Sequence, residues 1–151
     1  MALALALYLE TENKNVIPVV VDHGLQSESA QITLRTIEQL KKIGFNQIES
    51  AKAQVVITDG LEASARRARY QIFNQFIDAY NAKYFLLAHT LNDQAENVLL
   101  GLARGSGSRS LSGMAVQNNK FVRPLLKISR SVTDRKSTRL NSSHVSESRM
   151  P

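Results

Sequence analysis

Two carboxylates three residues apart are the feature of the sequence most suited to chemistry. Asp93 and Glu96 stand in the run His89-Thr-Leu-Asn-Asp-Gln-Ala-Glu, directly after a short apolar segment. Residues three apart share one helix face, so both side chains could bind Mg²⁺ or accept a proton from a nucleophile. However, Thr90 and Asp93 also have the spacing of a capping box, and the helix dipole favours acids in a first turn. Spacing alone favours the capping role.

A second polar turn follows an apolar run near the start of the chain. His23 and Gly24 come directly after Val16–Asp22. Glycine permits a sharp turn and a close backbone approach to a ligand, and His23 could hydrogen-bond a base or a phosphate. An ordinary strand-ending turn with a half-exposed histidine explains the same residues and is the more common case.

Two arginines lie on the side of a predicted helix that also carries Glu62. Glu62 and Arg66 are four residues apart, and Arg69 follows on the same side. The three could form a surface ion pair worth about 0.3–0.5 kcal/mol. Alternatively, Arg66 and Arg69 could present two guanidinium groups to phosphates. The residues alone do not choose between these interpretations.

Basic residues are concentrated late in the chain, around a stretch of small residues. Residues 97–133 contain six Lys or Arg and no acid, whereas residues 1–96 contain nine basic and eleven acidic residues. The block includes Arg104-Gly105-Ser106-Gly107, where small side chains would let backbone N–H groups approach a phosphate or RNA. These features indicate a polyanion partner, but a solvated basic face and a plain linker explain them equally well.

Composition limits the class of protein. A chain of 151 residues without cysteine fits one domain, and disulfides and thiolate metal sites are excluded. No apolar run reaches the roughly 18–20 residues that a membrane span needs, and the N-terminus does not resemble a signal peptide. We therefore expect a cytoplasmic protein that does not enter a membrane.

Helical and strand patterns alternate along the chain. Helices are predicted at Met1–Glu12, Ser29–Ile43, Leu61–Tyr80 and Leu91–Ala103. The last of these is expected to turn Ala95, Val98, Leu99 and Leu102 inward. Strands are predicted at Val16–Asp22, Gln54–Thr58 (or beginning nearer Ile48), Tyr84–Ala88 and Phe121–Val122. This alternation predicts an α/β fold with a parallel sheet, whose ligands lie beyond the strands' carboxyl ends. That rule selects residues 22–25, 58–60 and 89–93.

Several of these motifs occur together in a familiar order. Residues 21–29, 62–73, 86–114 and 122–126 resemble, in order and spacing, the tRNA(Ile)-lysidine synthetase family of N-type ATP pyrophosphatases, or PP-loop enzymes. The resemblance extends over residues 1–133, and the block at 86–114 is its most specific part. It implies a doubly wound, mostly parallel, Rossmann-like sheet of the adenine nucleotide alpha hydrolase type.

The resemblance also implies a reaction. The family uses ATP and Mg²⁺ to adenylate the wobble cytidine of tRNA(Ile), and the ε-amino group of free L-lysine then displaces AMP. By this resemblance, Asp93 and Glu96 correspond to the family's catalytic acidic pair, and Asp93 is also a possible Mg²⁺ ligand. The implied ATP- and substrate-binding residues are His23, Gly24, Arg66, Arg69, His89, Arg104, Gly105, Ser106 and Gly107.

The chain departs from the family at several places. Asn92 stands where many members have a second acid, and Thr90 replaces a second histidine. The family's Ser-Gly-Gly-x-Asp-Ser phosphate loop does not occur in the sequence, so we expect its first strand and loop to be missing and this chain to make no lysidine. Residues 134–151 resemble a translated sequencing adapter, and we expect them to form a disordered tail after a catalytic-domain portion at 1–133.

Two other functions compete with lysidine synthesis. A tRNA-thiolating PP-loop enzyme has the same fold, although such enzymes often need cysteines. A non-catalytic nucleotide-binding α/β module would not require the carboxylate pair beside the Arg-Gly-Ser-Gly segment. The residues do not predict an oligomeric state.

Overall fold

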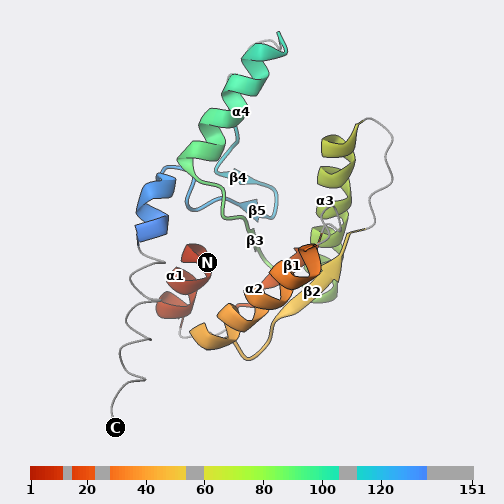
Figure 1. Ribbon diagram of the computed structural model, residues 1–151, viewed down its shortest axis with the longest axis vertical. Coiled ribbons are helices and arrows are strands. Elements are labelled where there is room, and N and C mark those ends of the chain that lie inside the picture. Colours follow the sequence, from red (N-terminus) through yellow and green to blue (C-terminus); the bar gives the residue numbers. More distant parts are fainter. Residues whose placement is uncertain (12–14, 23–27, 54–59, 106–111, 136–151) are drawn as a thin grey trace. The chain divides into compact units, whose positions relative to one another are not determined.

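The structure is a computed structural model that describes residues 1–11, 15–22, 28–53, 60–105 and 112–135. Helices and strands alternate along the described chain (Figure 1). The helices are α1 (Ala2–Thr11), α2 (Ser29–Ile43), α3 (Leu61–Ala79) and α4 (Leu91–Ala103), and residues 130–135 are also helical. The strands are β1 (Val19–Asp22), β2 (Glu49–Lys52), β3 (Phe85–Leu86), β4 (Gln117–Asn118) and β5 (Phe121–Val122).

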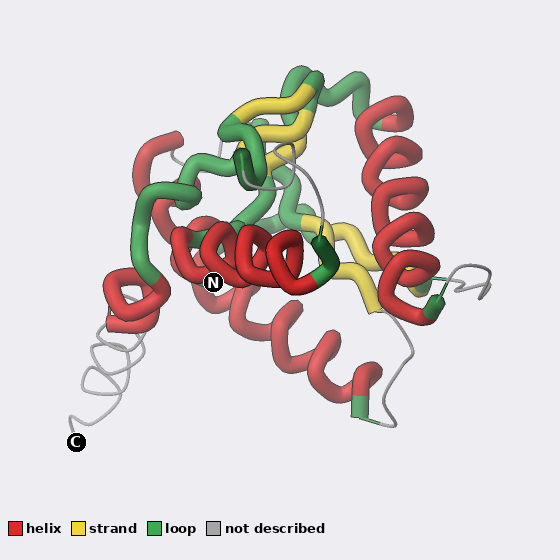
Figure 2. The backbone as a smooth tube through the Cα atoms, turned by 90° about the horizontal axis from the view of Figure 1, so that it is seen from above, coloured by secondary structure: helices red, strands yellow, loops and turns green. Residues whose placement is uncertain are grey.

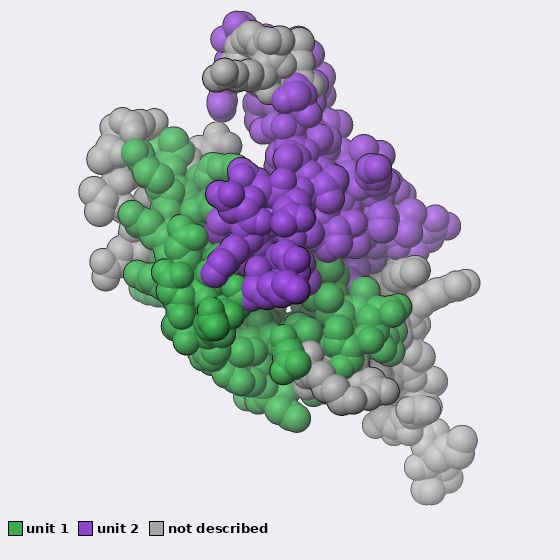
Figure 3. Space-filling model, turned by 180° about the vertical axis from the view of Figure 1, so that it is seen from behind, with its two compact units in different colours: residues 1, 3–82 green, residues 2, 83–151 purple. Residues whose placement is uncertain are grey.

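The chain divides into two compact units, coloured separately in Figure 3. The first unit comprises residues 1 and 3–82, and the second comprises residues 2 and 83–151. In the first unit β1 and β2 pair in parallel, from Val19 opposite Glu49 to Asp22 opposite Lys52. Helix α4 and both carboxylates of the pair, Asp93 and Glu96, belong to the second unit.

Helix α3 lies along the β1–β2 pair (Figures 1 and 2). Ala68 and Ile72 on α3 are buried together with Ala53 just after β2, and Val21 of β1 packs against them. Small residues at this contact let the helix backbone approach the strands closely. The apolar residues of α3 recur with a period of 3.6 residues because they lie on the one face of the helix that is buried.

Helix α1 packs near the end of α2. The rings of Tyr8 and Phe45 meet edge to face with centroids 5.5 Å apart. Gly44 ends α2 with a left-handed φ of 115°. A Cβ atom on Gly44 would collide with the Tyr8 ring, so both the backbone conformation and the close approach require glycine here.

The second unit contains a small mixed sheet with the order β3-β5-β4. β3 and β5 are parallel, and β4 and β5 form an antiparallel hairpin. The hairpin turns through Asn119, which has a φ of 52°, a conformation that asparagine tolerates. The N–H of Leu87 donates to the carbonyl of Val122 at 2.8 Å and continues the β3 ladder toward α4.

Helix positions were predictable, but strand positions were less so. Each predicted helix matches the observed one to within a residue over the described chain. The second strand lies at Glu49–Lys52, closer to the Ile48 alternative, whereas Gln54–Thr58 falls outside the described residues. The residues of Glu49–Lys52 alternate between partly buried and exposed. The run that follows them is more apolar, and for that reason it was the first choice for the strand. β4 was not predicted, because its two residues are polar and exposed.

The expected inward face of α4 is wrong. Leu99 and Leu102 are 64% and 54% exposed, Ala95 is also exposed, and Val98 is only partly buried. The strands of this unit have two residues each, so they offer little apolar surface to a helix of 13 residues. Apolar spacing predicted a helix correctly without predicting what would cover it.

The alternation of helices and strands and the parallel pairing are confirmed. The described strands form a two-stranded and a three-stranded sheet, so the single doubly wound sheet stays a prediction. Among the described helices, none is long and apolar enough to cross a membrane.

Candidate active site

The N-terminal turn of α4 is organised around Asp93. Thr90 precedes the helix in an extended conformation and is buried. Its backbone N–H and its hydroxyl both donate to Asp93 Oδ2, at 2.6 Å each. The backbone contact is one half of a capping box, whose other half is the Asp93 backbone N–H donating to the Thr90 side chain. The capping role that the spacing favoured is therefore confirmed.

Arg130 contacts both carboxylates of the pair. Its Nη2 atom lies 3.0 Å from Asp93 Oδ1 and 3.9 Å from Glu96 Oε1. The Arg130 backbone N–H also donates to the Asn92 side-chain oxygen at 2.9 Å. Asn92 carries no charge, but by accepting this hydrogen bond it holds the backbone at Arg130 against the start of α4. The prediction that Asp93 and Glu96 share one helix face is confirmed, because the same Arg130 guanidinium contacts both.

The environment of Asp93 keeps it ionised. Burial on its own raises the pKa of Asp93, but the hydrogen bonds from the Thr90 hydroxyl and N–H lower it, as do the charges of Arg130 and His89. The net effect is a pKa below the usual value. A carboxyl group of this kind is a fixed anion at neutral pH and a weak proton acceptor.

Glu96 is in a different setting from Asp93. Its side chain is 63% exposed, against 29% for Asp93. Because the longer Arg130 contact is with Glu96, this carboxylate is the less constrained of the two. The two acids thus differ in their freedom to change partners.

The carboxylate pair does not fit a Mg²⁺ site as it stands. Mg²⁺ needs several oxygen ligands at about 2.0–2.1 Å, whereas both Asp93 oxygens are engaged by Thr90 and Arg130. Within the described residues, no group of three or more His, Asp or Glu side chains could hold a metal. We therefore assign no step of the chemistry to a metal bound by Asp93.

The Arg-Gly-Ser-Gly segment begins at the far end of α4. Arg104 caps the C-terminus of the helix, and Gly105 follows with a φ of 64°. Arg104 lies eleven residues after Asp93, and a helix rises about 1.5 Å per residue, so the two residues are about 16–17 Å apart along the axis. Arg104 and Gly105 are thus separated from the carboxylates along the helix, and their expected role in substrate binding stays a prediction. Ser106 and Gly107 lie outside the described residues.

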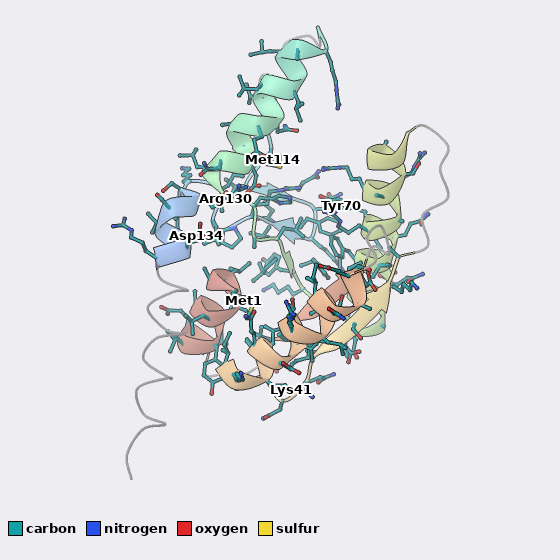
Figure 4. The ribbon with its side chains drawn as sticks, viewed as in Figure 1. Met1, Lys41, Tyr70, Met114, Arg130 and Asp134 are labelled. Carbon is teal, nitrogen blue, oxygen red and sulfur yellow. The ribbon has the colours of Figure 1, made fainter. Side chains whose placement is uncertain are left out.

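The chain returns to the carboxylates after that segment. Gln94, next to Asp93, makes two hydrogen bonds to the backbone of Met114. Figure 4 shows the labelled Met114 and Arg130 near the same end of α4. Sequence reasoning missed Gln94 and Arg130, because their partners lie 20 and 37 residues away and no local spacing reveals such a contact.

The remaining predicted residues are distributed elsewhere. Arg66 and Arg69 belong to the first unit, where Arg66 lies 5.2 Å from the centroid of the Tyr70 ring. Arg69 Nε is buried and has no hydrogen-bond acceptor among the described residues. His89 is half-buried just before Thr90. His23 and Gly24 lie outside the described residues.

Comparison with known proteins identifies the family to which this chain belongs. Residues 1–144 match a protein family described as PP-loop domain. The chain belongs to this family. It is 45% identical over 112 residues to the tRNA(Ile)-lysidine synthase of Thermobifida fusca (strain YX), covering 74% of this chain and 35% of that protein. It is 40% identical over 139 residues to the tRNA(Ile)-lysidine synthase of Rhodococcus opacus (strain B4), covering 92% and 42%.

One solved structure gives independent support for the PP-loop fold. The U34-tRNA thiolase NcsA from Methanococcus maripaludis matches 93% of this chain and 54% of its own chain, with a TM-score of 0.70. At 17% identity this likeness shows the fold alone and does not favour thiolation. The chain spans 35% to 42% of the length of the synthases named above, so its full activity is a matter for proposal.

Proposed function

We propose that this PP-loop chain carries the carboxylate-bearing part of a tRNA(Ile)-lysidine synthase active site, and that the reaction takes place in the cytoplasm. The observation that carries the proposal is the identity of 40–45% with such synthases, together with a structured acidic pair. The substrates would be ATP, free L-lysine and tRNA(Ile). The synthase would first transfer AMP from ATP to the carbonyl oxygen of the wobble cytidine, with loss of pyrophosphate. The lysine ε-amine would then attack the ring carbon that bears this oxygen, and AMP would leave with the oxygen.

The two acids would divide the work of the second step. The attacking amine must be neutral and loses a proton when the new C–N bond forms, so a base must take that proton. The lowered pKa of Asp93 makes it a poor base and a good counter-charge for an ammonium group. We therefore assign to Glu96 the role of the base that accepts the proton from the amine, and to Asp93 the binding of the positive charge.

The basic groups would serve the anionic substrates. Arg69, whose Nε has no acceptor among the described residues, and the exposed Arg66 would bind phosphates of ATP or tRNA. Arg104 and Gly105 would contact the tRNA backbone at the other end of α4. His89 would line the nucleotide pocket, and we extend the same proposal to His23, Gly24, Ser106 and Gly107. Residues 1–133 would form the catalytic-domain portion, and Mg²⁺ would accompany ATP rather than Asp93.

A chimeric enzyme tests the function without relying on this chain alone. In the Thermobifida fusca synthase, the stretch that matches this chain is replaced by residues 1–133. We expect the chimera to form lysidine in a tRNA(Ile) transcript, measured by mass spectrometry of nuclease digests. A second chimera that takes only residues 83–133 guards against misfolding of the larger exchange. A chimera that unfolds cooperatively near the parent temperature but makes no lysidine contradicts the proposal.

A further inference from the structure

The guanidinium group of Arg130 occupies the side of the carboxylate pair that the helix cap leaves open. Both hydrogen bonds from Thr90 reach Asp93 Oδ2, so Oδ1 is the Asp93 oxygen left for a cation. Arg130 Nη2 lies 3.0 Å from this oxygen and 3.9 Å from Glu96 Oε1. The guanidinium therefore stands where a positively charged ligand of both acids would bind.

The backbone of Arg130 is fixed to the start of α4. Its N–H donates to Asn92 Oδ1 at 2.9 Å, and the N–H of Leu91 donates to the carbonyl of Ile128 at 2.9 Å. Residue 130 also begins a short helix, in which the Thr133 hydroxyl donates to the Arg130 carbonyl at 2.8 Å. These hydrogen bonds keep the base of the side chain within reach of the acids, whatever the guanidinium contacts.

The Arg130 side chain is less restricted than its backbone. It is 49% exposed, and ion pairs in such positions contribute little to stability. Water can solvate the guanidinium after it leaves the acids, so its release costs little. Asp93, at 29% exposed, would then need another cation, because a partly buried charge is unfavourable without a partner. A fixed backbone with an exposed side chain thus allows the guanidinium to leave and to return.

We propose that Arg130 determines the affinity for lysine, because its guanidinium occupies the place on Asp93 and Glu96 that the ε-ammonium group of the substrate takes. This inference rests on the proposed function, in which Asp93 binds that positive charge. Two cations at the Oδ1 atom would repel each other, so lysine binds by displacing the guanidinium. Until lysine arrives, Arg130 keeps the two carboxylates paired with a cation.

The occupancy of the acids by Arg130 is tested in the 151-residue chain without any substrate. The charge of Arg130 is one of the causes that lower the pKa of Asp93, so Arg130→Met should raise that pKa. Lys127→Met is the matched control, because it removes an exposed cation from the same segment, and it should leave the pKa nearly unchanged. The titration is followed by NMR of the Asp93 carboxyl carbon. An Asp93 pKa that does not respond to Arg130→Met overturns the inference.

The displacement is tested in the chimera by steady-state kinetics. We expect Arg130→Met to lower the KM for lysine about threefold, as for the loss of a weak competing ion pair, with kcat and the KM for ATP unchanged. Lys127→Met should leave all three constants unchanged. The difference in the KM for lysine should narrow at high salt, because screening weakens the contact that lysine must break. A KM for lysine that rises or stays the same in Arg130→Met overturns the inference.

Failure of the proposed function is distinguishable from failure of the displacement. If the unsubstituted chimera makes no lysidine, the proposed function fails and the lysine assignment with it, while the Asp93 titration still decides whether Arg130 occupies the acids. If the chimera is active and its KM for lysine ignores Arg130→Met, the function stands and the displacement is wrong. Arg130→Lys keeps a cation and guards against misfolding, and it should lower the KM for lysine less than Arg130→Met.

Discussion

At the scale of single residues, Asp93 is both a structural cap and a candidate active-site acid. Its Oδ2 atom accepts two hydrogen bonds from Thr90, and its Oδ1 atom faces Arg130. These roles are compatible, because a carboxylate held by a cap keeps a defined position and a full charge. The side chain that closes the helix is then already placed to bind a cation.

The cap can be removed without touching a carboxylate. In Thr90→Ala the hydroxyl donor to Asp93 is lost, so we expect the free energy of unfolding of the chain to fall by about 1 kcal/mol. Urea unfolding measures this near neutral pH. The control is Thr36→Ala, whose hydroxyl bonds the carbonyl one turn earlier in an exposed part of α2. That change should stay within about 0.5 kcal/mol.

The effect of Thr90→Ala should also depend on pH. The folded pKa of Asp93 is lowered, so its stabilising contribution is present above the unfolded value near 3.8 and is lost as pH falls through the folded value. The difference between Thr90→Ala and the unsubstituted chain should therefore narrow in acid. A difference that grows as pH falls below the unfolded value would contradict the assignment of the cap to ionised Asp93.

At the scale of elements, α4 shows what local sequence can and cannot predict. Thr90 and Asp93 are three residues apart, so their contact follows from helix geometry and could be read directly from the chain. The contacts of Gln94 and Arg130 depend on segments that only tertiary packing brings back to the helix. For the same reason Leu99 was correctly placed on a helix but wrongly expected to be buried.

Strands were harder to place than helices for a related reason. A strand such as β3 or β4 has two residues, which is too short for a period-2 pattern to show. Helix α3 has 19 residues, and its apolar period repeats through five turns. The apolar residues of this period are buried at Ala65, Ala68, Ile72, Phe73 and Ile77. Tyr80, at the end of the helix, is exposed and donates its hydroxyl to Glu49 at 2.5 Å.

The packing of α3 on β1 and β2 gives a test of the first unit. Ile72 is 8% exposed and lies in the cluster with Ala53 and Ala68. Ile72→Ala should lower the free energy of unfolding by about 2–5 kcal/mol, because it leaves a cavity in addition to the lost burial. Gln75→Ala, on the exposed side of the same helix, is the control and should change stability little. Equal effects of the two substitutions would show that the cluster is not a core.

At the scale of the whole molecule, the family was predictable from motifs that were individually weak. The acidic pair, the two arginines of α3 and the Arg-Gly-Ser-Gly segment each allow an ordinary structural explanation. Their order and spacing resemble one family of PP-loop enzymes, and the match over residues 1–144 confirms that the chain belongs to the PP-loop family. The expected boundary at residue 133 stays a prediction, since residues 134 and 135 continue the helix begun at residue 130 and residues 136–151 lie outside the described part.

The central claim is that Asp93 and Glu96 carry the chemistry of lysine transfer. The most direct measurement is the rate of lysidine formation by the chimera with Asp93→Asn or Glu96→Gln, changes that keep the shape of each side chain and remove its charge. We expect Glu96→Gln to lower the rate at least a hundredfold, in the range typical of a lost general base, and Asp93→Asn to lower it because the counter-charge for the ammonium group is lost. Glu38→Gln on the exposed side of α2 should leave the rate unchanged. Near-normal rates in both Asp93→Asn and Glu96→Gln would contradict the account.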